Sequence, residues 1–199
     1  HVIVSAKLNN QQYWLDGTDL NQGTDLNTIG VPYLHYALPV APDSKDFVSM
    51  DDKYRIAETV LRRELWLDEP GSRLLVEARY SGHEAESQRS SWKDIPPQQI
   101  THQLLGYYSK LYPDLEGTSQ PEIKDNLRTN ELVVRQQFSS SAGIDELTRN
   151  ALPLYADLID SYLKTIDSAR KQPLALGAPV RIRQEFVFNL PHDVNIADY

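Results

Sequence analysis

Alternation of apolar and polar residues constrains this chain more than any other feature, and it is most regular through residues 59–67 and 73–80. The two runs flank Asp68-Glu69-Pro70-Gly71, a sequence typical of a turn. A period of two places alternate side chains on one face of a strand, so the runs predict a β-hairpin with an apolar face. That face carries Leu61, Arg63, Leu65, Leu74, Val76, Ala78 and Tyr80. Arg63 is charged, and the sequence alone does not account for it.

Helical periods and further strands follow this hairpin. A helix is predicted after Asp94, because Pro96 and Pro97 suit its first turn and Pro113 stops it. Its apolar stripe consists of Ile100, Leu104, Tyr107, Tyr108 and Leu111. A hairpin is then predicted between the residues near Ile123 and residues 132–138, with Leu132, Val134 and Phe138 pointing one way.

A second helix is predicted from about Pro153, and a last strand over residues 180–190. The helix has a 3.6-residue apolar period made by Tyr155, Leu158, Ile159, Tyr162, Leu163 and Ile166. The order hairpin, helix, hairpin, helix, strand predicts an α+β domain over residues 51–199, with an antiparallel sheet and helices on one face.

A shorter unit, residues 1–50, precedes this domain and opens with another predicted hairpin. Its strands read VIVSAKL and QYWL, and Asn9-Asn10 tolerates the positive φ of a two-residue turn. One face then carries Val2, Val4, Ala6, Leu8, Tyr13 and Leu15. The other carries His1, Ser5, Lys7, Gln12, Trp14, Asp16 and Thr18. The apolar face could lie exposed, pack on residues 51–199, or contact another copy of the chain in a homo-oligomer.

In this register His1 and Asp16 are diagonal neighbours on the polar face, with Cα atoms ~7–8 Å apart. A four-residue loop would keep them on that face but out of contact, and a three-residue loop would break the arrangement. A histidine whose ring N–H is accepted by an aspartate is the arrangement of a general base. The simpler interpretation is a terminal histidine and an aspartate that begins a turn, and spacing alone favours it.

Composition excludes several other functions. The formal net charge of −8 argues against a nucleic-acid surface, which needs clustered Lys and Arg. No run approaches the ~18 apolar residues of a membrane span. The absence of cysteine excludes disulfides, thiolate metal sites and a cysteine nucleophile in this chain.

The acidic, glycine-rich run 16–27 does not predict a metal site, and no cofactor is predicted. A calcium loop that starts at Asp19 would place Gly23 and Gly30 where ligands are needed. Turns capped by Asp and Asn side chains explain the run more simply. The five histidines show no ligand-like pairing. The serine-rich stretches 88–92 and 139–143 lack the nucleophile-elbow pattern and are interpreted as loops.

Residues 1–23, HVIVSAKLNNQQYWLDGTDLNQG, resemble the second half of the catalytic core of transglutaminase-like proteins, a papain-like superfamily. His1 matches the family's histidine and Asp16 its aspartate, although Gly17 stands where the family has proline. Residues 36–40 resemble the tail of that core in large bacterial members. Residues 74–86, 107–116 and 125–138 resemble the additional domain that follows it there, whose function is not established.

The resemblance implies a C-terminal part of a cysteine-dependent acyltransferase or peptidase acting on a protein or peptide. The family's cysteine would lie upstream of His1, so the chain alone is expected to be inactive. An envelope or exported location is expected from the resemblance. The alternative is a non-catalytic β-rich binding or scaffolding module, with a groove lined by Trp66, Trp92 or Tyr107.

Overall fold

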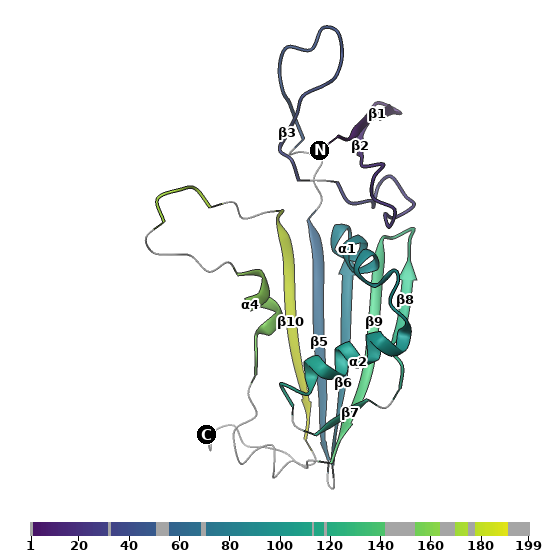
Figure 1. Ribbon diagram of the computed structural model, residues 1–199, viewed down its shortest axis with the longest axis vertical. Coiled ribbons are helices and arrows are strands. Elements are labelled where there is room, and N and C mark those ends of the chain that lie inside the picture. The colour runs from purple at the N-terminus through teal and green to yellow at the C-terminus, as the bar shows by residue number, and fades with distance from the viewer. Residues whose placement is uncertain are drawn as a thin grey trace.

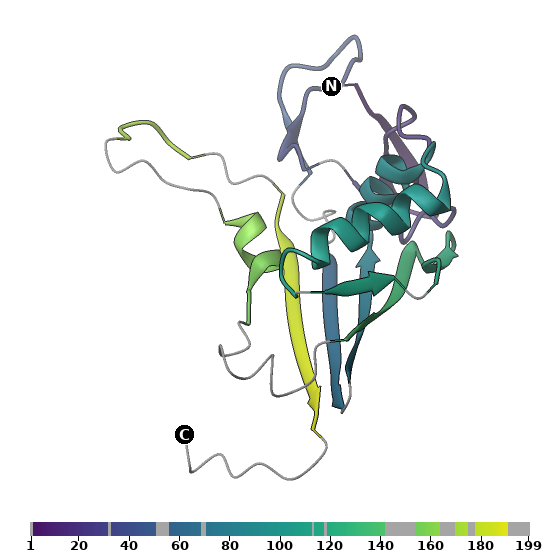
Figure 2. The ribbon, with the colours of Figure 1, turned by 60° about the horizontal axis from the view of Figure 1, so that its bottom comes forward.

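The computed structural model describes residues 2–31, 33–50, 56–68, 71–112, 114–117, 119–141, 154–163, 170–174 and 178–190. Within them the chain mixes helices with strands, which confirms the predicted α+β class. A central sheet carries helices on one face, and the N-terminal unit lies at one end of it (Figures 1 and 2).

The central sheet has the strand order β10-β5-β6-β9-β7, and β8 also pairs with β9. Its strands are β5 (Ala57–Asp68), β6 (Gly71–Ser81), β7 (Leu115–Gly117), β8 (Glu122–Asn126), β9 (Glu131–Ser140) and β10 (Val180–Asn189). Two predicted hairpins are confirmed: β5 pairs with β6 up to Asp68↔Gly71, and β8 pairs with β9 through Ile123↔Val134.

The core lies between the sheet and its helices. The predicted face of the β5–β6 hairpin supplies much of it, together with Phe138 of β9. Apolar members of this cluster include Leu61, Leu65, Leu74 and Val76. Arg63 also points into this layer and is 0% exposed. The opposite face of the sheet carries the charged positions of the same strands.

The sheet is mixed rather than antiparallel throughout, because β10 pairs with β5 in parallel from Val180↔Ala57 to Asn189↔Trp66. Since β5, β6 and β9 alternate in direction, β9 runs parallel to β5. The chain crosses over between the end of β9 at Ser140 and the start of β10 at Val180, which lies on the side of β5 away from β6. Two parallel strands can be joined only by such a crossover. The sequence gives the length of this connection but not the direction of the strand that follows it.

The described helices are α1 (His83–Trp92), α2 (Pro97–Tyr108) and α4 (Asp157–Tyr162). Helix α2 lies where it was predicted. Helix α1 was missed, so the loop interpretation of residues 88–92 is wrong; its buried residues are Ala85 and Glu86, which give no apolar stripe. Ser139 and Ser140, also interpreted as loop, belong to β9. No helix in the described part of the chain is long and apolar enough to cross a membrane.

Helix α4 is shorter than predicted, because Leu163 leaves the helical conformation with ψ 120°. Of its predicted apolar stripe, Leu158 packs against the core. The other described members, Tyr155, Ile159, Tyr162 and Leu163, are exposed. The positions predicted at Pro153 and Ile166 lie outside the described residues.

The N-terminal hairpin consists of β1 (Val4–Leu8) and β2 (Gln11–Leu15). The predicted two-residue register is confirmed by Leu8↔Gln11, and both Asn9 and Asn10 have positive φ, as a type I′ turn requires. Two short strands follow, β3 (Tyr36–Ala37) and β4 (Val48–Ser49), which pair with each other.

Candidate ligand-binding site

A cavity of about 400 Å³ lies between the sheet and the three described helices. Its floor is formed by side chains of β5, β6 and β9, and its walls come from α1, α2 and α4. Apolar and aromatic side chains dominate the lining: Leu61, Val76, Ala78, Tyr80, Trp92, Leu104, Tyr107, Tyr108, Val134 and Leu158. Cavities that bind small molecules have this size and composition.

Gln136 is the most buried amide on the cavity's floor, at 2% exposure. It stands on the apolar face of β9, between Val134 and Phe138. Its Nε2 donates to Ser119 O at 2.6 Å, whereas its Oε1 has no hydrogen-bond partner among the described residues. A buried acceptor without a donor costs about 1–3 kcal/mol. A ligand with an N–H or O–H group that reaches this oxygen would recover part of that cost.

Asp157 lies at the polar end of the cavity. It is the charged partner that explains why Arg63 can be buried. Its carboxylate accepts hydrogen bonds from the Arg63 guanidinium and from the Tyr107 hydroxyl. Gln184 Nε2 also donates to it at 3.0 Å. Arg63 lies over the ring of Phe186 as well, with Cζ 5.5 Å from the centroid. Through these contacts α4 is held against β5 by Arg63, against α2 by Tyr107 and against β10 by Gln184.

The protonation of this cluster is fixed by its geometry. Burial alone would raise the pKa of Asp157, but the bonds from Arg63, Tyr107 and Gln184 outweigh it and lower that pKa below its usual value. Burial, together with the Asp157 carboxylate, raises the pKa of Tyr107 to about 12. At neutral pH the cluster is therefore a carboxylate paired with a guanidinium.

The glycine-rich run 16–27 of the N-terminal unit is built from turns. Its Asp side chains cap turns: Asp19 Oδ1 accepts from Asn21 N at 2.9 Å, and Asp25 Oδ1 accepts from Asn27 N at 2.8 Å. The pentapeptide GTDLN occurs at residues 17–21 and again at 23–27, and it makes the same turn contact in both places. The described residues contain no group of three side chains placed to hold a metal ion.

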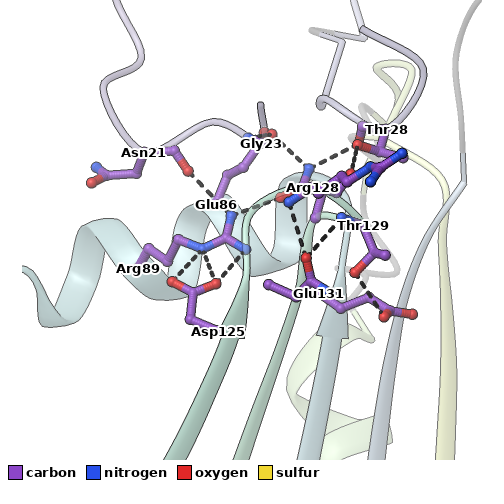
Figure 3. A network of polar contacts seen from close by, with 11 residues as sticks. Asn21, Gly23, Thr28, Glu86, Arg89, Asp125, Arg128, Thr129 and Glu131 are labelled. Atoms are coloured by element: carbon purple, nitrogen blue, oxygen red, sulfur yellow. Dashed lines mark hydrogen bonds and ion pairs between the residues drawn. The ribbon is translucent and has the colours of Figure 1, made fainter. Parts of the chain in front are cut away.

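Glu86 of α1 binds this run to the sheet domain (Figure 3). Its Oε1 accepts from Gly23 N at 3.2 Å, from Gly30 N at 2.9 Å and from Asn130 Nδ2 at 2.7 Å. Arg89, one turn later, donates to Asn21 O and pairs with Asp125. A Cβ on Gly30 would overlap Glu86 Oε2, so this close approach requires glycine.

Only one member of the predicted His1/Asp16 pair, Asp16, lies among the described residues. His1 lies outside the described residues, so its distance to Asp16 stays a prediction. Asp16 is buried directly after β2, and its Oδ1 accepts from Thr18 N at 2.9 Å and from Thr18 Oγ1 at 2.6 Å. One carboxylate oxygen therefore caps the turn that follows β2.

A second hollow, of about 500 Å³, lies on the charged face of the sheet, but most of its charged groups pair with one another. Glu77 accepts from both Arg79 and Arg135, and Arg62 pairs with Glu64 at 3.0 Å. The burial of Glu77 opposes ionisation, yet these two arginines lower its pKa. The cavity under the helices is therefore the better candidate.

No protein-family model, no curated protein and no solved structure matches this chain. The transglutaminase-like resemblance and the division at residues 50/51 accordingly stay predictions. The sequence indicated Trp66, Trp92 and Tyr107 as possible groove residues. Trp92 and Tyr107 line the cavity, whereas Trp66 does not and instead packs under Arg73. Gln136 and Asp157 were not predicted from the sequence. Gln136 gave a signal, because it interrupts the apolar alternation of residues 132–138; Asp157 gave none.

Proposed function

We propose that this chain is a non-catalytic binding module whose cavity takes a small apolar molecule, or an apolar side chain of a peptide, that carries a hydrogen-bond donor. The observation that carries the proposal is a cavity lined by aromatic and aliphatic side chains that contains the open acceptor Gln136 Oε1. Asp157 is already paired with Arg63, so a neutral ligand suits the site better than a cation.

The test is titration with N-phenyl-1-naphthylamine, a neutral aromatic amine whose fluorescence rises in apolar surroundings. We expect saturable binding to the wild type. Val134→Phe, which fills the cavity, should weaken binding at least tenfold. Val133→Phe is the matched control: it is the adjacent residue on the opposite face of β9, and binding should stay within twofold.

The Gln136 contact has its own measurement. Gln136→Leu should weaken binding of the amine about fivefold to tenfold, because one hydrogen bond contributes about 1 kcal/mol. Binding of 1-phenylnaphthalene, which lacks the N–H, should not weaken. Apolar peptides that displace the probe would point to a peptide ligand, and displacement by small aromatics alone would point to a free molecule. If Val134→Phe and Val133→Phe bind the amine equally, the cavity is not the site.

A second candidate is the transglutaminase-like one, in which His1 and Asp16 serve a cysteine supplied by a segment outside this chain. Two observations favour it. The β1–β2 register is the two-residue-turn register from which the His1/Asp16 pair was predicted, and part of the apolar face of this hairpin is exposed, with Leu8 at 51%. That face would then be covered by the segment that carries the cysteine.

This candidate is tested by the coding sequence upstream of His1. A predicted helix with cysteine at its N-terminus supports it, and a chain extended to include that helix should hydrolyse or transfer acyl groups and lose activity in Asp16→Ala. An upstream sequence without cysteine rejects it. A concentration-dependent dimer that Leu8→Asp abolishes, measured by light scattering, would instead assign the face to a second copy of this chain.

A further inference from the structure

The two edges of the central sheet differ. At one edge, β7 and β8 are three and five residues long and share the outer side of β9. At the other edge, β10 is ten residues long and pairs with β5. No described strand pairs with the outer side of β10, and no described loop donates or accepts a backbone hydrogen bond there. Short edge strands protect a sheet from further pairing, whereas a long one can accept another strand.

Helix α4 stands beside this open edge (Figures 1 and 2). It is attached to β10 through Gln184, whose Nε2 donates to Tyr155 O at 2.7 Å and to Asp157 Oδ1. Tyr155, Ile159 and Leu163, spaced four residues apart, are exposed, Leu163 at 67%. Ile159 lies in α4, and Tyr155 and Leu163 flank the helix. These exposed apolar residues, beside a strand edge with which no described strand pairs, make a composite docking surface, with backbone groups for pairing and apolar area for packing.

We propose that the outer edge of β10 accepts an extended segment of a partner protein, which adds a strand to the sheet beside α4. Its alternate residues would be apolar on the helix side and acidic on the other. The proposal does not depend on the cavity or on the catalytic candidate.

The chemistry of the segment follows from the two faces of β10. On the helix side, β10 presents Ile182 and Phe186, so facing positions of an added strand would be apolar. On the open side it presents Arg181 and Arg183, both exposed. Arg183 pairs with Glu185, whereas Arg181 has no ion pair with any described residue. Acidic residues opposite these two arginines would therefore be favourable.

A second copy of the chain fits this edge less well than a separate segment does. Antiparallel pairing about a two-fold axis at Gln184 would place Arg183 opposite the partner's Glu185, which is favourable. However, α4 is bound to Gln184 itself, so the axis would bring both copies of α4 to the same position. A single extended segment has no such helix and avoids the clash.

The test uses a nine-residue peptide that alternates valine and glutamate, with a control peptide of the same composition arranged in two blocks. We expect the alternating peptide to bind and to slow hydrogen exchange of β10 amides in the full chain. Arg181→Glu combined with Arg183→Glu should weaken binding about tenfold, because two cross-strand charge pairs become repulsive. Lys124→Glu on the opposite edge is the control and should change affinity less than twofold.

Several results would overturn the proposal. One is full protection of every β10 amide in the free protein, which would mean that the edge is already occupied. Another is equal binding of the alternating and block peptides, and a third is peptide binding that protects a different strand. A β10-dependent homodimer in solution would assign the edge to a second copy of the chain instead.

Discussion

The hairpins β1–β2 and β5–β6 are built by the same local rules and differ in what covers them. Each is closed by a two-residue connection, between Leu8 and Gln11 in one and between Asp68 and Gly71 in the other. Each has an apolar face. In β5–β6 that face is the core, and Leu65 is 3% exposed; in β1–β2, Val4 is 57% exposed. Alternation therefore specifies a register, whereas burial depends on a covering layer from elsewhere.

The most buried residues of the β1–β2 unit lie on the side expected to be polar. Trp14 and Asp16 are buried there, whereas Val2, Val4 and Leu8 on the apolar face are exposed. An isolated two-stranded hairpin is marginally stable in water. The attachments of the following run to Glu86 and Asn130 hold it near the sheet domain without covering its apolar side. This contrast leads to five measurements.

The largest effect on the unfolding free energy is expected for Arg63 and Asp157, a buried polar pair within an otherwise apolar layer. Asp157→Ala removes the partner of a fully buried guanidinium. Breaking such a pair costs about 3–5 kcal/mol of unfolding free energy, and urea unfolding measures the loss. Asp160→Ala, which changes an exposed residue of the same helix, is the control. Substitutions at such surface positions change the free energy by less than about 0.5 kcal/mol. Equal effects of the two variants would show that the pair does not stabilise the sheet.

The comparison between the hairpins is tested by a matched pair of truncations. Leu65→Ala removes a core side chain, and such a truncation costs about 2–5 kcal/mol. Leu8→Ala removes an exposed side chain. Its effect should stay within about 0.5 kcal/mol, as for other surface substitutions. A cost for Leu8→Ala near that of Leu65→Ala would mean that the β1 face is covered in solution.

The attachment of the N-terminal run can be loosened without touching either hairpin. Gly30→Ala places a methyl group against Glu86. Overpacking of this kind should cost about 1–3 kcal/mol. The amides of Gly23 and Gly30, which donate to Glu86, should then exchange faster. Gly17→Ala is the control, because Gly17 has open space around it. In this variant the exchange of the Gly23 and Gly30 amides should stay unchanged.

The contribution of Asp157 to the unfolding free energy is expected to depend on pH. The pKa of folded Asp157 is lowered. Its stabilisation is therefore fully present above the unfolded value of about 3.9 and is lost as pH falls through the folded value. Asp157→Asn should flatten the acid side of the curve of unfolding free energy against pH, below about pH 4. An unchanged acid side would show that other carboxylates dominate.

The smallest effect concerns the turn of the first hairpin. Asn9 and Asn10 both have positive φ, and type I′ turns favour Asn-Gly. Asn10→Gly should stabilise the hairpin by up to about 0.5 kcal/mol by removing left-handed strain. Slower amide exchange in β1 and β2 is the expected readout. Faster exchange would mean that the added chain entropy outweighs the relieved strain.

Local patterns predicted what local forces determine. The turn at Asn9-Asn10, the hairpins β5–β6 and β8–β9, and helix α2 all depend on residues close in sequence. Helix α1 was missed because Glu86 and Arg89 stabilise it through polar contacts with distant segments rather than through an apolar stripe.

The features that could not be predicted are those whose partners are far apart in the chain. Arg63 is explained by Asp157, 94 residues later, and no period in the sequence connects them. The cavity, and the direction of β10, depend in the same way on how separate elements are packed together. Of the candidate site, only its aromatic walls at Trp92 and Tyr107 were indicated in advance.

The parallel pairing of β10 with β5 also has a kinetic consequence. Val180 pairs with Ala57, so 180 − 57 = 123 residues separate the first contact of this ladder. At about 5–20 residues per second, a ribosome needs about 6–25 s to synthesise that interval. During this interval β5 can pair with β6, but the edge of β5 that later pairs with β10 stays unpaired. For most of the interval Asp157, the partner of Arg63, has not been synthesised. We expect the β5 edge to be the segment of the nascent chain that most needs protection from other strands.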